Sequence, residues 1–234
     1  MTTPREILGH ISGGKVLDVA TGDGGFISFL LEGFQSYTEI TGIDCNDKCA
    51  ACFAELFKEK PNIHFVKMDA TKLDFPDASF DTVCISNSIH HLQNPKAILA
   101  EMIRVLRPGG LIIISEMYRD NQTDTQMTHV HLHHWLAAVD KTKGIVHNET
   151  YTRQQLLNLI LSLGMNIMTL NDFSDLSKDP LAADTIQNLN KIIDQYLQRA
   201  ENHPDLQARS EELHQRVSQI GYHDATNLIA ILER

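Results

Sequence analysis

Short apolar runs alternate with helix-like spacings along the first half of the chain. The apolar runs are nearly continuous, which is typical of strands that are buried on both faces of a sheet. They predict strands over residues 15–20, 37–44, 63–68, 80–86 and 111–117. The segments between them predict helices over residues 26–33, 47–60 and 95–106. This alternation indicates βαβ units, so we expect an α/β fold with a doubly wound, mostly parallel sheet.

The second half of the chain is more polar, and its helical segments are longer. Thr152 and Gln155 have the spacing of a capping box that opens a helix. The pattern predicts helices over residues 120–143, 153–163 and most of 180–220, and strands over residues 165–170 and 226–232. Because no repeat or low-complexity linker interrupts the sequence, we expect one domain over residues 1–234. Residues 119–144 and 173–224 are its predicted helical lid insertions.

Composition excludes several classes of protein. The 234 residues include 20 Lys and Arg against 30 Asp and Glu, a net charge of −10, which argues against binding nucleic acid by bulk electrostatics. The longest apolar runs, such as residues 111–114, are too short to cross a bilayer, so we expect no membrane partner. The four cysteines do not form a disulfide scaffold, and the first residues carry no signal-peptide pattern. We therefore expect a cytoplasmic protein.

A glycine-rich turn follows the first predicted strand, in the sequence VLDVATGDGG that begins at Val16. Glycine lets the backbone approach a ligand closely, and the following helix directs its free N–H groups to the same place. Enzymes that bind dinucleotides and enzymes that bind S-adenosylmethionine (SAM) both use such a turn. The dinucleotide pattern requires a third small residue, and the branched Ile27 at that position counts against it.

Acidic residues follow the next two predicted strands. Asp44 ends the second strand, and Asp69 follows the third. The distance in sequence from Gly22 to Asp44 matches the roughly 20 residues between a glycine turn and an acid that binds ribose. Carboxylates accept hydrogen bonds from hydroxyl and amino groups and balance a cation. The alternative is that these acids only cap turns and end strands.

The glycine turn, the two acids and the segments FDTV (80–83) and LRPGG (106–110) occur in an order that resembles the class I SAM-dependent methyltransferases. The segment SNSIHHL (86–92) is similar to the type 11 methyltransferases of ubiquinone and menaquinone biosynthesis. The resemblance implies strand order 3-2-1-4-5-7-6 with the last strand antiparallel, and a structural role for His91. The cofactor-binding residues that it implies are Asp18, Ala20, Thr21, Gly22, Gly24, Asp44, Cys45, Asp69, Ala70, Asn87 and Ser88. Phe26 stands where the family has a third glycine.

Three cysteines, Cys45, Cys49 and Cys52, have the spacing of the cluster ligands in radical-SAM enzymes. We reject this interpretation because Cys49 and Cys52 lie in a segment of helical periodicity, where free cysteine behaves as a small hydrophobic residue. The cysteines also come after the second predicted strand, whereas radical-SAM enzymes carry them near the first.

The segment MTHVHLHHW (127–135) holds four histidines. On a helix, His129 and His133 share one face, and His131 and His134 share another. Three interpretations stay open for them: solvated or packing side chains, a base or substrate-orienting group, or a metal site. The candidate catalytic residues are His131, His133 and His134. A metal site would use His129 and His133 with a third ligand such as His147 or Glu116.

Four residues are candidates for contacting the substrate: Glu116, Tyr118, His129 and Trp135. Glu116 and Tyr118 alternatively just end the fifth strand, and Trp135 fits lid packing equally well. We predict SAM-dependent methylation of a small-molecule acceptor, with SAM as the cofactor, beneath the histidine-rich lid. The alternatives are a SAM- or metal-binding protein without catalysis and a nucleotide-dependent oxidoreductase. The acceptor atom and the oligomeric state stay open.

Overall fold

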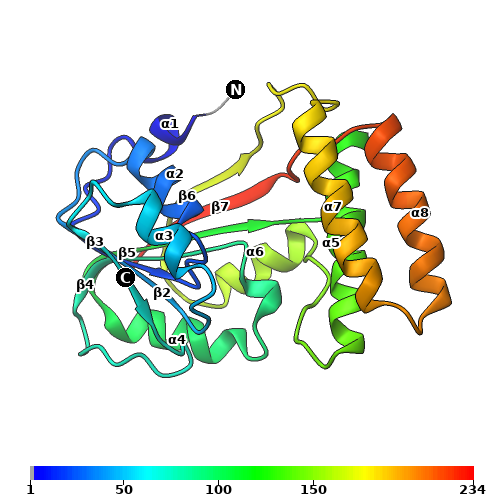
Figure 1. Cartoon of the computed structure of the whole chain (residues 1–234). Coiled ribbons are helices and arrows are strands. Elements are labelled where there is room, and N and C mark those ends of the chain that lie inside the picture. Colours follow the sequence, from blue (N-terminus) through cyan, green and yellow to red (C-terminus); the bar gives the residue numbers. More distant parts are fainter. Residues whose placement is uncertain (1–2) are drawn as a thin grey trace.

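The computed structural model describes residues 3–234, and these residues form one sheet of seven strands (Figure 1). The strands are β1 (Lys15–Val19), β2 (Glu39–Asp44), β3 (Ile63–Lys67), β4 (Phe80–Ser86), β5 (Leu106–Met117), β6 (Asn166–Phe173) and β7 (Asn227–Glu233). Their order is β3-β2-β1-β4-β5-β7-β6. Strands β1 to β5 pair in parallel, and β7 is antiparallel to both β5 and β6. The predicted fold class and strand order are confirmed.

Helices cover both faces of the sheet (Figure 1). The helices are α1 (Pro4–Leu8), α2 (Gly25–Gly33), α3 (Ala50–Leu56), α4 (Pro95–Val105), α5 (Asp124–Thr142), α6 (Arg153–Leu161), α7 (Ala183–Arg199) and α8 (Pro204–Gln219), with a short 3-10 helix η1 (Ile89–His91). Alternate residues of β1 show why the strands are apolar throughout. Val16 packs with α1, α2 and α3 on one face, whereas Leu17 packs with α4 and α6 on the other.

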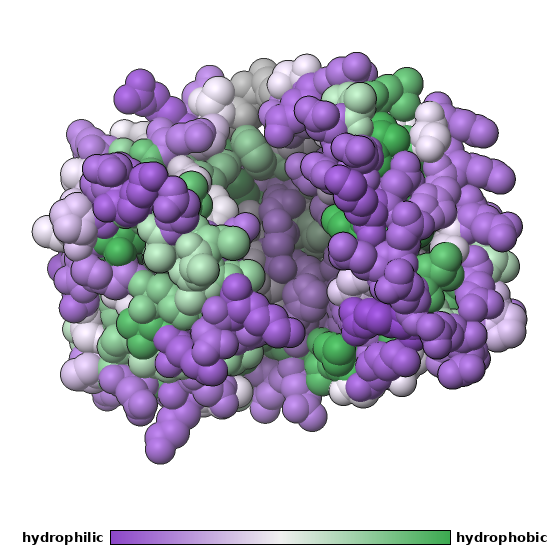
Figure 2. Space-filling view, viewed as in Figure 1, coloured by the Kyte–Doolittle hydropathy of each residue, from purple (hydrophilic) through white to green (hydrophobic). Residues whose placement is uncertain are grey.

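Helices α5, α7 and α8 form a separate helical unit beside the sheet (Figure 1). They surround their own apolar core, in which the fully buried Trp135 packs with residues such as Leu189 and Leu213. The two predicted insertions therefore meet: α5 lies in the first, and α7 and α8 lie in the second. Figure 2 shows the molecule hollowed between the sheet and this unit, with hydrophilic side chains in the hollow.

Two predicted segments differ from the structure. The helix expected over residues 47–60 is shorter, Ala50–Leu56, and its N-terminal residue Cys49 provides no side-chain cap. The break expected at residues 107–110 is part of β5, because Gly109 donates its N–H to the Arg234 carbonyl and Gly110 accepts from the Arg234 N–H. Pairing at long range thus extends the strand through a sequence that locally favours a turn.

Candidate cofactor and substrate site

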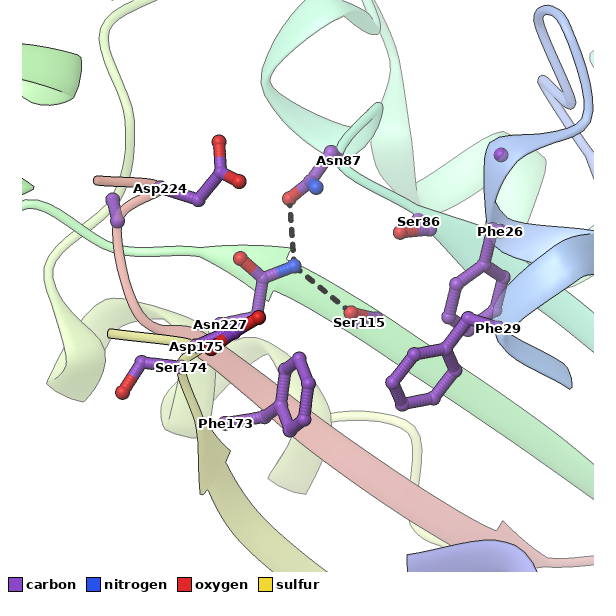
Figure 3. Close-up of a pocket in the computed structure, with 12 residues that line it drawn as sticks. Phe26, Phe29, Ser86, Asn87, Ser115, Phe173, Ser174, Asp175, Asp224 and Asn227 are labelled. Atoms are coloured by element: carbon purple, nitrogen blue, oxygen red, sulfur yellow. Dashed lines mark hydrogen bonds between the residues drawn. The ribbon is translucent and has the colours of Figure 1, made fainter. Parts of the chain in front are cut away.

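A cavity of about 320 Å³ opens at the edge of the sheet where the parallel strands end (Figure 3). Because β7 is antiparallel, its first residue Asn227 lies at this edge, as does the last residue of β6, Phe173. A second cavity of about 270 Å³ adjoins the first around Phe26 and Asn87, which line both. We call the first the outer cavity and the second the turn cavity, since Asp18 and Thr21 of the glycine turn line it.

The glycine turn adopts backbone conformations that glycine tolerates best. Gly22 and Gly24 have φ angles of +54° and +91°. A Cβ at Gly24 would lie 2.4 Å from a ring atom of Phe57, so this position also lacks the space for a side chain. Thr21 donates its N–H to the Ile43 carbonyl, which holds the turn against β2. These contacts fix the backbone beside the turn cavity.

Asp18 is the buried carboxylate of the turn cavity, with only 1% of its surface exposed. Its Oδ2 accepts a hydrogen bond from Thr21 Oγ1 at 2.6 Å, but its Oδ1 is buried without a partner among the described residues. Burial raises the pKa of Asp18 to about 7; the Thr21 hydroxyl opposes this rise, and the charge of Asp44 adds to it. Asp18 thus lines the turn cavity with one carboxylate oxygen whose hydrogen-bonding capacity is unused among the described residues.

Asp44 connects the turn to the end of β2. Its two oxygens accept from the Gly22 N–H at 3.1 Å and the Asn46 N–H at 2.9 Å. Burial raises the pKa of the Cys45 thiol, and the charges of Asp44 and Asp69 raise it further. All three residues lie at the end of β2 and β3, where Asp44 pairs with Lys67.

Asp69 is exposed, and its Oδ1 accepts from both the N–H and the hydroxyl of Thr71 at 2.8 Å. These bonds lower the pKa of Asp69. Ala70, the other residue predicted here, packs against the core on the α4 side. The sheet edge thus brings the predicted acids Asp18, Asp44 and Asp69 together, although Asp18 and Asp44 lie closest to the turn.

Asn87 stands between the two cavities with a φ angle of +43°. Its side-chain oxygen accepts from the Met117 N–H and from Asn227 Nδ2, both at 3.0 Å (Figure 3). The neighbouring Ser88 hydroxyl donates to the Ser86 carbonyl at 2.7 Å. Sequence reasoning missed Asn227, whose one signal is a polar residue at the start of an apolar strand.

Glu116 is fully buried and organises the loop after β4. Its Oε2 accepts from the N–H groups of Ser88 and Ile89, at 3.1 and 2.8 Å, and its Oε1 contacts His90 Nδ1 at 2.5 Å. Tyr118 is also buried, in the core beside α6. Neither lines the outer cavity or the turn cavity, and their contact with substrate stays a prediction beside the alternative that they only end β5.

The predicted catalytic histidines lie apart from the two cavities. His131 is exposed near Arg209 and Arg216 of α8, whose charges add to burial in lowering its pKa. His134 Nε2 lies 2.9 Å from the Thr150 hydroxyl. The structure thus shows no contact between these side chains and the space at the sheet edge, and their catalytic roles stay predictions.

Two residues predicted to contact substrate have other neighbours. Trp135 is fully buried within the helical unit, where its indole N–H donates to the Leu206 carbonyl at 2.8 Å. This environment matches lid packing and not stacking on a substrate. His129 Nδ1 accepts from the Ala225 N–H at 2.9 Å. Ala225 itself lines the outer cavity, so His129 supports its wall from behind.

A different set of histidines gathers in the structure. Within residues 3–234, the group of side chains arranged to hold a metal is His90, His91, His133 and His147. The predicted pair of His129 and His133 is therefore corrected: helical spacing put them on one face, but His129 bonds to the β7 side and His133 turns to His90. The predicted third ligand His147 is present. The cysteine triad forms no such group, with Cys45 and Cys52 exposed.

No helix within the described residues is both long enough and apolar enough to cross a membrane.

Burial disfavours the charged form of two rings in the histidine group, His133 and His147. Burial, reinforced by the neighbouring imidazoles, lowers the pKa of His133 to about 2. Burial also lowers the pKa of His147, although Asp140 opposes this shift.

Comparison with known proteins finds relatives of the first half of the chain. Residues 17–114 match a family model described as a methyltransferase domain. A demethylmenaquinone methyltransferase from Renibacterium salmoninarum is 35% identical over 113 residues, which cover 47% of this chain and 44% of that protein. The ubiquinone/menaquinone biosynthesis C-methyltransferase UbiE from Nitrosospira multiformis is 34% identical over 115 residues, 49% of this chain and 47% of that protein. The chain thus matches less than half the length of these curated relatives.

Solved structures extend the likeness to the whole fold. The [4+2]-cyclase SpnF superposes with a TM-score of 0.59 at 19% identity, covering 99% of this chain and 78% of that chain. A putative methyltransferase from Bacillus halodurans gives a TM-score of 0.55 at 18% identity, covering 94% and 90%. At these identities the likeness concerns the fold alone. Residues 17–114 of the chain therefore resemble a methyltransferase domain, and the chain has the fold of the class I SAM-dependent methyltransferases.

Proposed function

We propose that this protein transfers a methyl group from SAM to a small-molecule acceptor. The observation that carries the proposal is the buried, unpartnered Oδ1 of Asp18, which belongs to the strand before the glycine turn, inside the segment that matches a methyltransferase domain. A cavity that keeps a carboxylate oxygen free needs a cationic or hydrogen-bond-donating ligand. SAM carries an ammonium group, a sulfonium and two ribose hydroxyls, and it supplies an activated methyl group.

The residues at the sheet edge fit the separate parts of this cofactor. Asp44 has carboxylate oxygens beside the glycine turn, where they would accept from ribose hydroxyls. Asp69 and Ala70 would border the adenine. Asp18 would face the ammonium end, because it lines the turn cavity and one of its carboxylate oxygens has no partner among the described residues. Asn87, shared by both cavities, would then mark the boundary between donor and acceptor.

The outer cavity supports an acceptor with an aromatic ring and polar substituents. Phe26, Phe29 and Phe173 form an apolar wall, in which Phe29 and Phe173 meet edge to face with centroids 5.2 Å apart. Asp224 and Asn227 provide polar atoms on another side of the same cavity (Figure 3). Its volume suits a small ligand. The names of the curated relatives, which refer to ubiquinone and menaquinone, favour a quinone-like ring as the acceptor class.

Methyl transfer requires mainly that the acceptor be held in line and that water be excluded. The aromatic wall would hold the ring, and Asn87 and Asn227, which are hydrogen-bonded to each other, would fix its polar edge. Where the acceptor must lose a proton, Asp224, one of two carboxylates that line the outer cavity, would receive it.

Calorimetry with SAM and matched aspartate variants tests the donor side. Asp44→Ala removes at least one charge-assisted hydrogen bond worth about 1.5–3 kcal/mol, so the Kd of SAM should rise by roughly 10- to 150-fold or more. Asp47→Asn is the control, because Asp47 is an exposed carboxylate that pairs with Lys67 at the surface. An unchanged Kd for Asp44→Ala removes Asp44 from the site.

Turnover separates the proposal from its alternatives. Formation of demethylated cofactor with a panel of hydroxylated quinone-like rings would support methyl transfer. Tight SAM binding without turnover on any ring or other metabolite would favour a binding protein that does no catalysis. Binding of NAD or NADP in place of SAM would favour an oxidoreductase. The turnover assay is needed because the fold also serves a cyclase.

A further inference from the structure

Four imidazoles from three separate segments meet beneath the loop that follows β4. His90 and His91 belong to η1, His133 belongs to α5, and His147 lies in the loop after α5. One ring nitrogen of each lies within 4.8 Å of the chosen nitrogen of every other. His90, His133 and His147 are buried, and His91 is exposed. None of the four lines the outer cavity or the turn cavity.

The Nε2 atoms of His90 and His147 both lie against Nε2 of His133. His133 Nε2 lies 3.0 Å from His90 Nε2 and 3.1 Å from His147 Nε2. Imidazole nitrogens around a tetrahedral zinc ion, at about 2.0–2.1 Å from the metal, lie about 3.4 Å apart. The observed separations are within a few tenths of an ångström of that geometry, so a small outward movement of the rings would admit an ion.

Carboxylates orient two of the rings from behind. His90 Nδ1 donates to Glu116 Oε1 at 2.5 Å, and His147 Nδ1 donates to Asp140 Oδ2 at 2.7 Å. Asp140 is itself held by Arg199, which donates to its Oδ1 at 2.5 Å. A carboxylate behind a ligating histidine fixes the ring and its tautomer and is a regular feature of metal sites.

The same hydrogen bonds leave the centre of the cluster without enough protons. When His90 and His147 are neutral and carry their proton on Nδ1, their Nε2 atoms both present lone pairs to His133 Nε2. A neutral His133 has one proton to offer at that nitrogen, and it cannot direct that proton at both neighbours. A cation bound by all three lone pairs removes this conflict.

We propose that His90, His133 and His147 bind one divalent ion of the zinc type through their Nε2 atoms, with His91 as the fourth ligand at the exposed side. Imidazole ligands in a tetrahedral set select such an ion over magnesium or calcium, which prefer oxygen. The site does not depend on the proposed methyl transfer. It would fasten α5 of the helical unit to the loop after β4, and through Glu116 it would hold the amides of Ser88 and Ile89 beside the cavities.

Metal titration of the untagged full chain, stripped with EDTA, tests the site. The wild type should bind one equivalent of Zn²⁺ in competition with a chromogenic chelator and should not bind Mg²⁺ there. Co²⁺ should give the intense visible bands of a tetrahedral nitrogen site, and Zn²⁺ should abolish them. Glu116→Gln and Asp140→Asn should weaken Zn²⁺ binding roughly 10- to 100-fold, and His133→Gln and His147→Asn by at least that much.

His131→Gln is the matched control, because His131 lies on the same helix but is exposed and outside the cluster. It should keep the wild-type affinity within about twofold. Circular dichroism shows whether each variant folds. If His133→Gln does not fold, ¹⁵N spectra of the wild-type imidazoles decide, since Zn²⁺ should shift three Nε2 resonances together. Wild-type binding no tighter than that of a folded His133→Gln variant, an octahedral Co²⁺ spectrum, or unshifted Nε2 resonances would each overturn the proposal and leave a chain of hydrogen-bonded histidines without metal.

Discussion

Replacing Asp18 by Asn measures how much the protonation of this buried carboxyl group contributes to the free energy of unfolding. Asp18 is buried, and its Oδ1 has no partner among the described residues. Burial and the charge of Asp44 raise its pKa from 3.8 to about 7, against the effect of the Thr21 hydrogen bond. The folded state therefore favours the protonated, neutral acid, which the Asn side chain imitates at every pH.

The sign of the pH dependence follows from proton binding. Between about pH 4 and pH 7 the folded protein holds a proton on Asp18 that the unfolded chain has released, so this group stabilises the fold at low pH and loses that contribution as the pH rises through about 7. At about 1.4 kcal/mol for each unit of pKa shift, the full change is at most about 4 kcal/mol. Below about pH 4 and above about pH 7 its contribution is flat.

Urea unfolding of the wild type and of Asp18→Asn, at half-unit steps from pH 4 to pH 8, measures this contribution. The difference between the two free energies of unfolding cancels the other titrating groups. As the pH rises from about 4 to about 7, the free energy of unfolding of the wild type should fall relative to that of Asp18→Asn by up to about 4 kcal/mol. Thr21→Val removes the hydrogen bond to Oδ2 that lowers the pKa of Asp18. In this background the change in stability should therefore be centred at a higher pH. A difference that is constant across the whole range would refute the buried, protonated carboxyl group.

Two further pairs of substitutions test the turn and the helical unit. Gly24→Ala should lower the free energy of unfolding by about 2–4 kcal/mol, because it combines a positive φ with a clash against Phe57, whereas Gly22→Ala, with open space around its Cβ, should cost only about 1 kcal/mol. Chemical denaturation compares the two, and equal losses would contradict the argument from space. Trp135→Ala should cost about 3–5 kcal/mol, and Trp135→Phe, which loses mainly the bond to Leu206, about 1–2 kcal/mol. A Trp135→Ala variant as stable as the wild type would show that the indole does not hold the helical unit together.

The strands themselves and the glycine turn were predictable because local signals decide them, whereas the strand order followed only from the resemblance to a known family. Strands buried on both faces need apolar runs, and the turn needs residues that tolerate positive φ, so Gly22 and Gly24 are visible in the sequence. Asp44 and Asp69 followed from the rule that parallel strands end at one edge of the sheet. The extra length of β5 was not predictable, because its start depends on pairing with Arg234, far away in the sequence.

The histidine cluster shows where local reasoning fails. Helical spacing groups His129 with His133, but spacing says nothing about which neighbour meets the helix face. His133 contacts His90, 43 positions away, and the carboxylate that orients His90 comes from Glu116 on another strand. Only the packing of α5 beside the sheet brings these groups together. In the same way, Asn227 and Phe173 join the cavity because β7 and β6 run antiparallel.

The position of β7 has a consequence for biosynthesis. This strand is made after β5 and β6 but lies between them, so a nascent chain that stops short of residue 227 leaves both with an open edge. Those edges would expose unpaired backbone groups that attract other strands. Asn227 also completes a wall of the outer cavity. Ribosome-bound fragments that end before β7 should therefore aggregate readily, and their outer cavity should lack part of its wall. A small ligand that occupies the outer cavity would rescue only chains whose translation has passed this strand.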